Sequence, residues 1–293
     1  MGARVLGVVL LLFAFIALLF IAQTKLTGLV QPAGSTNSSS SVAVGPARGP
    51  APPPTPSGVS PTRTSTVRLP VPPTGFTQKD LSPYYGYITI GNISRGYGTQ
   101  YSAISLRAGN FSDASLNISN WRIQGNRGST YMPRAVTLYD PSGLASEGDI
   151  YMKSGHTVTM YSTLSALGKN VRLNKCMGYL ENTVDFNPRL SLSCPNDRPA
   201  NFTSLSGACQ DYIRSLSGCR VPSGNPPVSI YDDACRTYLN TLNYKGCYDR
   251  HAGDKDFLSN QWLIWTGGKF LDERHDRVFL YDGNNLIVDE YTY

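Results

Sequence analysis

The chain of 293 residues contains 26 lysines and arginines against 20 aspartates and glutamates, which gives a formal net charge of +6. Residues 1–80 hold six of the basic side chains and one of the acidic ones, so the charges of residues 81–293 nearly cancel. A nucleic-acid-binding domain needs a clustered basic face, and no stretch of residues 81–293 has such a cluster. We therefore expect no nucleic-acid partner.

Residues 5–22 are apolar without interruption and carry no charge. A run of this length can cross the roughly 30 Å hydrocarbon core of a bilayer as a slightly short helix. Arg4 precedes the run, so the positive-inside bias keeps the N-terminus in the cytoplasm. A cleaved signal peptide is the alternative, but Phe20 to Gln23 form a poor cleavage site. We predict an uncleaved transmembrane signal anchor over residues 1–22, with the folded domain outside the plasma membrane at the cell surface.

Residues 23–80 are rich in serine, threonine, proline and glycine, with one acidic residue and few large apolar ones. Such a composition cannot bury enough apolar surface to offset the entropy that is lost on ordering. We predict a disordered tether that its prolines partly extend. Residues 81–293 are enough for one sizeable domain.

Short segments with alternating apolar and polar residues, bounded by glycine, asparagine or aspartate, lie at both ends of this domain. The pattern predicts β-strands in an antiparallel sandwich. Residues 282–285 tolerate positive φ angles and predict a hairpin, and Trp121 is expected in the core. The expected strands cover residues 87–90, 105–107, 116–123, 135–139, 156–161, 261–265, 277–281 and 286–291.

Between these two parts the period becomes helical. In residues 204–217 and 231–243, apolar side chains recur on one helical face. We predict a helical hairpin inserted into the sandwich at about residues 195–255. The expected capping residues are Ser206 and either Asp232 or Asp233 at the helix starts, with Gly218 and Gly246 at the helix ends.

All six cysteines lie between residues 176 and 247, and an even number in a translocated domain indicates disulfide bonds. No Cys-x-x-Cys motif is present and the whole chain has three histidines, so we expect no metal and no cofactor. In an antiparallel helical hairpin the start of one helix faces the end of the other. That geometry predicts the nested pairs Cys209–Cys247 and Cys219–Cys235. The third pair, Cys176–Cys194, would join neighbouring strands, although other connectivities are open.

Three segments resemble a known family. Residues 101–123 read as a strand, an asparagine-containing loop and a strand with an asparagine-preceded tryptophan, residues 150–162 as a turn and strand, and residues 275–293 as a closing hairpin. Together they resemble the lamin-tail family, although Ser154-Gly155 stands where that family usually has Pro-Gly. The resemblance implies a mainly β fold, an immunoglobulin-like antiparallel β-sandwich of the type found in extracytoplasmic bacterial proteins. It implies an interaction role and supplies no catalytic residues.

The helical insertion suggests where a partner could bind. Residues 220–227, including Arg220 and Asn225, form a proline-rich loop between the two predicted helices. A rigid scaffold that presents a loop is a common recognition surface, although the hairpin could equally be a cover for an edge or face of the sandwich. Trp262 and Trp265 are three residues apart on a strand and should face opposite sides, so one is expected at the surface or against the helical hairpin.

These observations favour a membrane-tethered, non-catalytic binding or envelope-organising protein, with a surface protein or a glycan as its partner. The alternative is an extracytoplasmic hydrolase that uses acid–base groups near His251, with Asp249 and Asp254 close to it in the chain. We favour the first, because polar residues after a helix are more often structural. The two hypotheses differ in whether these groups converge in one pocket with perturbed pKa values.

Overall fold

The computed structural model describes residues 70–97, 100–111, 115–190, 192–195, 202–216, 218–222 and 232–293. The predicted anchor, residues 5–22, and most of the predicted tether lie outside this part of the chain. Within the described residues, no helix combines the length and the apolar character needed to cross a membrane. The described part is mainly β, with three sheets, several helices and three disulfide bonds.

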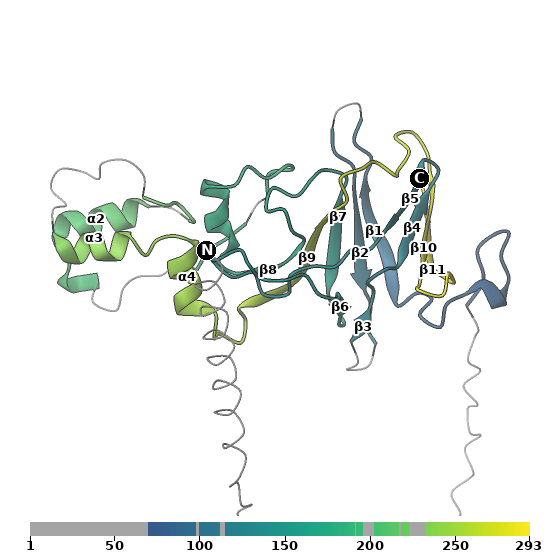
Figure 1. Cartoon of the computed structure of the whole chain (residues 1–293), viewed down its shortest axis with the longest axis horizontal. Helices are drawn as coiled ribbons and strands as arrows, with labels where there is room; N and C mark the ends of the chain where they lie inside the picture. Colours follow the sequence, from purple (N-terminus) through teal and green to yellow (C-terminus); the bar gives the residue numbers. More distant parts are fainter. Residues whose placement is uncertain are drawn as a thin grey trace, which may run out of the picture. The chain divides into compact units, whose positions relative to one another are not determined.

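The largest sheet has five strands in the order β1-β2-β7-β9-β8 (Figure 1). Its neighbours pair antiparallel except β7 and β9, which run parallel. The prediction of a purely antiparallel sandwich is therefore wrong at this pair. Parallel neighbours need a long crossover connection, and here β8 and the helices supply it. The strands are β1 (Ile88–Ser94), β2 (Ala103–Ala108), β7 (Thr157–Tyr161), β8 (Val171–Asn174) and β9 (Leu258–Trp265).

A second sheet has four antiparallel strands in the order β11-β10-β4-β5. Two predicted strands differ from the structure. The segment 116–123 is divided between β3 and β4, because Asn120 adopts a left-handed conformation with a φ of 64°. The segment 135–139 contributes only isolated bridges at Ala135 and Val136. The strands of this sheet are β4 (Arg122–Gly125), β5 (Gly128–Tyr131), β10 (Arg277–Tyr281) and β11 (Ile287–Thr292), and β3 (Leu116–Asn117) pairs with β6 (Tyr151–Met152).

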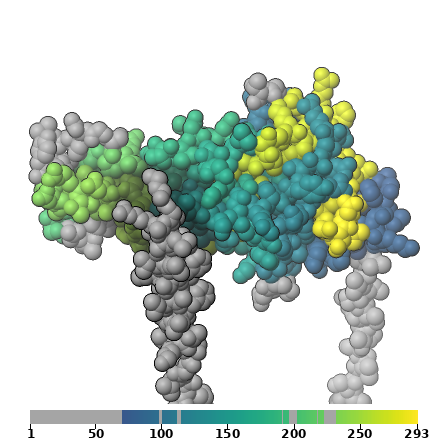
Figure 2. All heavy atoms as spheres, in the orientation of Figure 1, coloured from purple at the N-terminus to yellow at the C-terminus, as the bar shows by residue number. Residues whose placement is uncertain are grey.

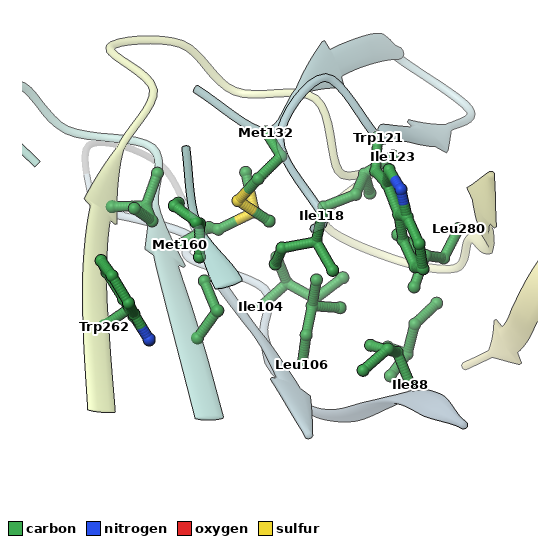
Figure 3. Packing of buried hydrophobic residues seen from close by; sticks show 14 of the residues in the cluster. Ile88, Ile104, Leu106, Ile118, Trp121, Ile123, Met132, Met160, Trp262 and Leu280 are labelled. Atoms are coloured by element: carbon green, nitrogen blue, oxygen red, sulfur yellow. The ribbon is translucent and has the colours of Figure 1, made fainter. Parts of the chain in front are cut away.

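The two larger sheets share one hydrophobic core. Strands β7 and β10 alternate between buried and half-buried residues, which turns one face of each strand inward. Ile104 from the first sheet packs in the same cluster as Ile123 and Leu280 from the second (Figure 3). Trp121 belongs to this cluster as well, which confirms its predicted place in the core.

The hairpin between β10 and β11 forms as predicted. Asp282 organises its turn, because one carboxylate oxygen accepts hydrogen bonds from the backbone N–H groups of Asn284 and Leu286, at 2.8 and 3.0 Å. The other carboxylate oxygen accepts a hydrogen bond of 2.7 Å from the hydroxyl of Ser82. Buried polar groups need such partners, so this aspartate fixes the hairpin to a segment 200 residues earlier in the chain.

That earlier segment belongs to the folded unit. It contains a short 3-10 helix, η2 (Gln78–Asp80). The centroid of the Phe76 ring lies 5.3 Å from the centroid of the Phe279 ring on β10. Figure 2 shows the blue atoms of this segment beside yellow atoms of the C-terminal strands. The folded unit therefore begins before residue 81, inside the segment that the composition assigned to the tether.

The second half of strand β9, residues 262–265, is buried on both faces. Trp262 belongs to the core between the sheets, whereas Trp265 belongs to a second hydrophobic cluster. Their exposed fractions are 2% and 7%, so neither lies at the surface. Trp265 shares its cluster with Tyr244 and Cys247 of the helical insertion, which agrees with the other place expected for one of the two. The second cluster includes Phe186, whose ring lies 6.3 Å from that of Trp265, and the 3-10 helix η3 (Met177–Asn182).

Of the three α-helices in the described residues, two match the predicted ones, α2 (Gly207–Ser215) and α3 (Asp233–Leu239). Ser206 and Asp232 cap them, as expected, by accepting a hydrogen bond from a first-turn N–H. Figure 1 shows these two helices side by side. A further short 3-10 helix, η4 (Phe202–Ser204), precedes α2.

The sequence does not predict the helix α4 (Tyr244–His251), because a glycine at position 246 is typical of the end of the preceding helix. Gly246 lies inside α4, and its backbone N–H donates a 2.9 Å hydrogen bond to the capping side chain of Asn243. A Cβ atom at this position would stand 2.1 Å from the carbonyl oxygen of Thr241. The glycine is therefore required by a close backbone approach and does not end a helix.

All six cysteines form disulfide bonds, as predicted, but the predicted pairing is wrong. The bonds are Cys176–Cys247, Cys194–Cys219 and Cys209–Cys235. The nested pairing assumed that Cys247 follows the end of the second helix. Instead α4 carries Cys247 to Cys176 at the start of η3, and Cys194 lies outside any strand.

We predict that truncating a core side chain of β4 strongly destabilises the domain. Ile123→Ala should lower the free energy of unfolding by about 2–5 kcal/mol, because it removes buried methyl groups and leaves a cavity. Gln124→Ala, on the exposed face of the same strand, should change it by less than about 0.5 kcal/mol. Urea unfolding followed by tryptophan fluorescence measures both changes. Equal effects of the two substitutions would contradict the assignment of the core face.

We also predict that the disulfide connectivity will be found as described above. Proteolysis of the unreduced chain, followed by mass spectrometry, should release three linked peptide pairs that separate on reduction. The pair that contains Cys176 should carry Cys247. Recovery of a Cys176–Cys194 peptide would restore the pairing expected from the sequence.

Candidate binding site

A surface pocket lies where the disulfide-linked segment meets the second hydrophobic cluster. This junction pocket has a volume of about 480 Å³. A smaller hollow of about 250 Å³ shares three of its side chains, Glu181, Asn182 and Arg189. The junction pocket is lined by Gly178, Glu181, Asn182, Arg189, Leu192, Ser193, Cys194, Gly218 and Cys219.

One wall of the junction pocket is the short loop of residues 218–222, which is fixed at two points. The disulfide Cys194–Cys219 closes it covalently. The side chain of Asn182 donates a 2.7 Å hydrogen bond to the carbonyl oxygen of Cys219 and accepts one of 3.4 Å from the N–H of Val221. Gly178 makes room for this arrangement, because a Cβ there would stand 2.1 Å from the sulfur of Cys219.

The pocket contains charged groups that the described part of the chain leaves unpaired. One carboxylate oxygen of Glu181 is buried and has no hydrogen-bond partner. Arg189 lines the pocket with Glu181, and Asp185 lines the smaller hollow; neither has an ion-pair partner among the described residues. A buried acceptor without a donor costs roughly 1–3 kcal/mol. Such a group favours a ligand that donates a hydrogen bond.

Of the predicted binding residues, Arg220 is the one that the structure places beside this pocket. It is exposed and follows Cys219 directly. Asn225 lies outside the described residues, and Trp262 and Trp265 are buried in the two clusters. The sequence does not point to Glu181, in η3, or to Arg189, after it, because neither charged residue belongs to a recognisable motif. The disulfide spacing alone could not locate them.

The residues of the hydrolase hypothesis divide between two places. Asp249 pairs with Lys245 at 2.6 Å and lines a groove of about 620 Å³ along α3 and α4. His251 and Asp254 do meet, with Nδ1 of the histidine 2.8 Å from the carboxylate. Neither of them is among the described residues that line the groove. The three groups therefore do not share that concavity.

Asp254 is held in its ionised form. Lys175 donates hydrogen bonds of 2.9 Å to Asp254 and 2.7 Å to Asp256. The hydrogen bond from Lys175, followed by that with His251, lowers the pKa of Asp254 below its ordinary value. A carboxyl group with a lowered pKa is ionised at neutral pH and has no proton to donate, so this cluster forms an ion-pair link between the end of β8 and the segment after α4.

The described residues contain no group of three or more histidine, cysteine, aspartate or glutamate side chains that could hold a metal ion. No protein-family model, no curated protein and no solved structure matches this chain. The function must therefore be inferred from the geometry of the chain's own residues.

We predict that the Lys175 ion pairs stabilise the fold only where their carboxylates are ionised. The lowered pKa of Asp254 gives stability that is fully present above 3.8, the ordinary value, and is lost as the pH falls through the folded-state value. Lys175→Met should therefore lower the melting temperature at pH 7, and the difference from the wild type should shrink below pH 4 or so.

Lys153→Met, at an exposed lysine, is the matched control and should leave the melting temperature nearly unchanged at both pH values. Differential scanning calorimetry across this pH range measures the effect. A difference between wild type and Lys175→Met that stays constant with pH would contradict the ion-pair explanation.

Proposed function

We propose that this chain is a non-catalytic binding or envelope-organising protein, held at the plasma membrane by residues 5–22 and carrying its folded domain outside the cytoplasm. Its partner would be a surface protein or a glycan. The observation that carries the proposal is the junction pocket, where Glu181 and Arg189 remain unpaired among the described residues. Arg220 presents a further exposed cation beside it.

The fold proposed here is a lamin-tail-like, immunoglobulin-like β-sandwich with a disulfide-stapled helical insertion. Two features support it: the two larger sheets share one core, and the chain ends in the β10–β11 hairpin. Three disulfide bonds suit an oxidising compartment outside the cytoplasm, which agrees with the predicted anchor. In this proposal the sandwich is a rigid support, and the segment between β8 and β9, which contains the junction pocket, carries recognition.

The construction of the junction pocket favours binding. Its loop is fixed by Cys194–Cys219 and by Asn182 before any ligand arrives. Preorganisation of this kind lowers the entropy that is lost on association. The hydrolase alternative has less support. Asp254 is paired with Lys175, and Asp249 lines a groove whose described lining residues do not include His251 or Asp254.

Two experiments in intact producing cells test the proposal. First, added protease should remove the folded domain; a domain that stays protected while the N-terminus is cut would contradict the topology. Second, a photo-crosslinking residue at Ser193, an exposed position of the junction pocket, should give a discrete adduct with one envelope component. The same residue at Asn92, exposed on β1, should not.

The adduct should fall by about tenfold or more in Arg189→Ala, because charge-assisted hydrogen bonds contribute roughly 1.5–3 kcal/mol. Arg107→Ala, which removes an exposed arginine of β2, is the matched control and should leave it unchanged. The melting temperature of both variants should equal that of the wild type. An adduct of the same strength from Asn92, or one that survives Arg189→Ala, would move recognition away from this pocket.

A further inference from the structure

A row of three side chains crosses the outer face of the four-stranded sheet. Tyr281 on β10 is paired in register with Arg122 on β4, which in turn is paired with Tyr131 on β5. Directly opposed residues of antiparallel strands project from the same face. Their chain neighbours Leu280 and Ile123 are fully buried in the core, so this Tyr-Arg-Tyr row faces away from it.

Arg122 is held in place without a counter-ion. Its guanidinium carbon lies 4.1 Å from the centroid of the Tyr281 ring, within the range of a cation–π contact. It donates hydrogen bonds to the side-chain oxygens of Gln124 and Asn285, both of which are neutral. Arg277, on the same face, differs in being paired with Glu290 at 2.6 Å. Arg122 has no ion pair among the described residues and so presents a fixed, uncompensated positive charge.

Tyr131 provides an open aromatic surface next to this charge. Its exposed fraction is 60%, and it lies on β5, an edge strand of the sheet. Within the described part of the chain, its side chain makes no ring contact and no hydrogen bond. A tyrosine ring combines an apolar face with a polar hydroxyl group, which suits the face of a sugar ring with its surrounding hydroxyls.

We propose that the Tyr-Arg-Tyr row binds a carboxylated sugar, with the carboxylate paired to Arg122 and the sugar ring stacked on Tyr131. The planar guanidinium matches a carboxylate in a bidentate arrangement. Gln124 and, opposite it on β5, Ser129 are exposed polar side chains in the next row of the same face, where sugar hydroxyls can form hydrogen bonds. This site lies in the sheet and does not depend on the function proposed for the junction pocket.

Charge complementarity selects this ligand class. Arg122, which has no ion pair among the described residues, favours an anion, and the exposed ring beside it adds a stacking surface that a bare anion cannot use. The polar side chains around the row favour a hydroxylated ligand over an apolar protein surface, whose burial would leave these groups without partners. The row therefore discriminates an acidic sugar both from a neutral sugar and from a free anion.

Isothermal titration calorimetry with the full chain in neutral detergent tests the proposal. An oligomer of galacturonic acid is the probe, and a neutral oligomer of glucose is the control ligand. We expect saturable binding of the acidic oligomer and none of the neutral one. Arg122→Gln should weaken binding about 10- to 100-fold, as expected for the loss of a charge-assisted pair, and Tyr131→Ser should weaken it as well.

The matched control Arg107→Gln removes an exposed positive charge from the other sheet and should leave the affinity unchanged. The proposal is overturned if the acidic oligomer does not bind, or if Arg107→Gln weakens binding as much as Arg122→Gln. It is also overturned if inorganic phosphate binds as tightly as the oligomer. Should Arg122→Gln fail to fold, unchanged affinity in Tyr131→Ser, at an exposed edge position, would decide against the site.

Discussion

The arrangement of the domain depends on strand β9, which two hydrophobic clusters share. On one face of β9, Trp262 packs in the core between the sheets. On the other face, Trp265 packs in the second cluster, which also contains residues of η3. The second half of β9, residues 262–265, is therefore buried on both faces and consists of apolar residues alone, as expected where a strand has no solvent-exposed side. Because β9 also pairs in parallel with β7, the chain between them must cross over. That crossover contains every cysteine and the junction pocket.

Each disulfide bond connects a different pair of segments within this crossover. Cys176–Cys247 ties α4 to η3, which belongs to the second cluster, and Cys209–Cys235 ties α2 to α3 around a third small cluster. Helices of this length are marginal alone in water. The cross-links and the small apolar clusters together stabilise them. Cys194–Cys219 then fixes the loop beside Glu181 and Arg189, which have no ion pair within the described part of the chain. The elements that line the junction pocket therefore depend on covalent bonds more than on a large core.

Local features of the fold could be predicted from the sequence, whereas its long-range pairings could not. The alternating residue pattern and the flanking turn residues predict strands β7 and β10, and the side chains of Ser206 and Asp232 predict the helix caps, because each of these signals is local. The parallel pairing of β9, the burial of Trp265 and the place of Cys247 depend on segments far away in the chain. Tyr281 reaches Arg122 for the same reason, since β10 pairs with β4 from far away in the chain, whereas Arg122 and Tyr131 lie on the consecutive strands β4 and β5.

The hydrogen bond between Ser82 and Asp282 has a consequence for the order in which the domain folds during synthesis. Leu81 bridges to Ile287, and the N–H of Gly86 donates to the carbonyl oxygen of Val288, so the start of the folded unit is completed by β11. Contacts of such large sequence separation are slow to form, because loop closure costs entropy before they can contribute. The four-stranded sheet therefore has to wait until β10 and β11 leave the ribosome. Until then β4 and β5 pair only with each other in this sheet, and the apolar face to which Ile123 belongs lacks Val278 and Leu280 of β10 and Val288 of β11.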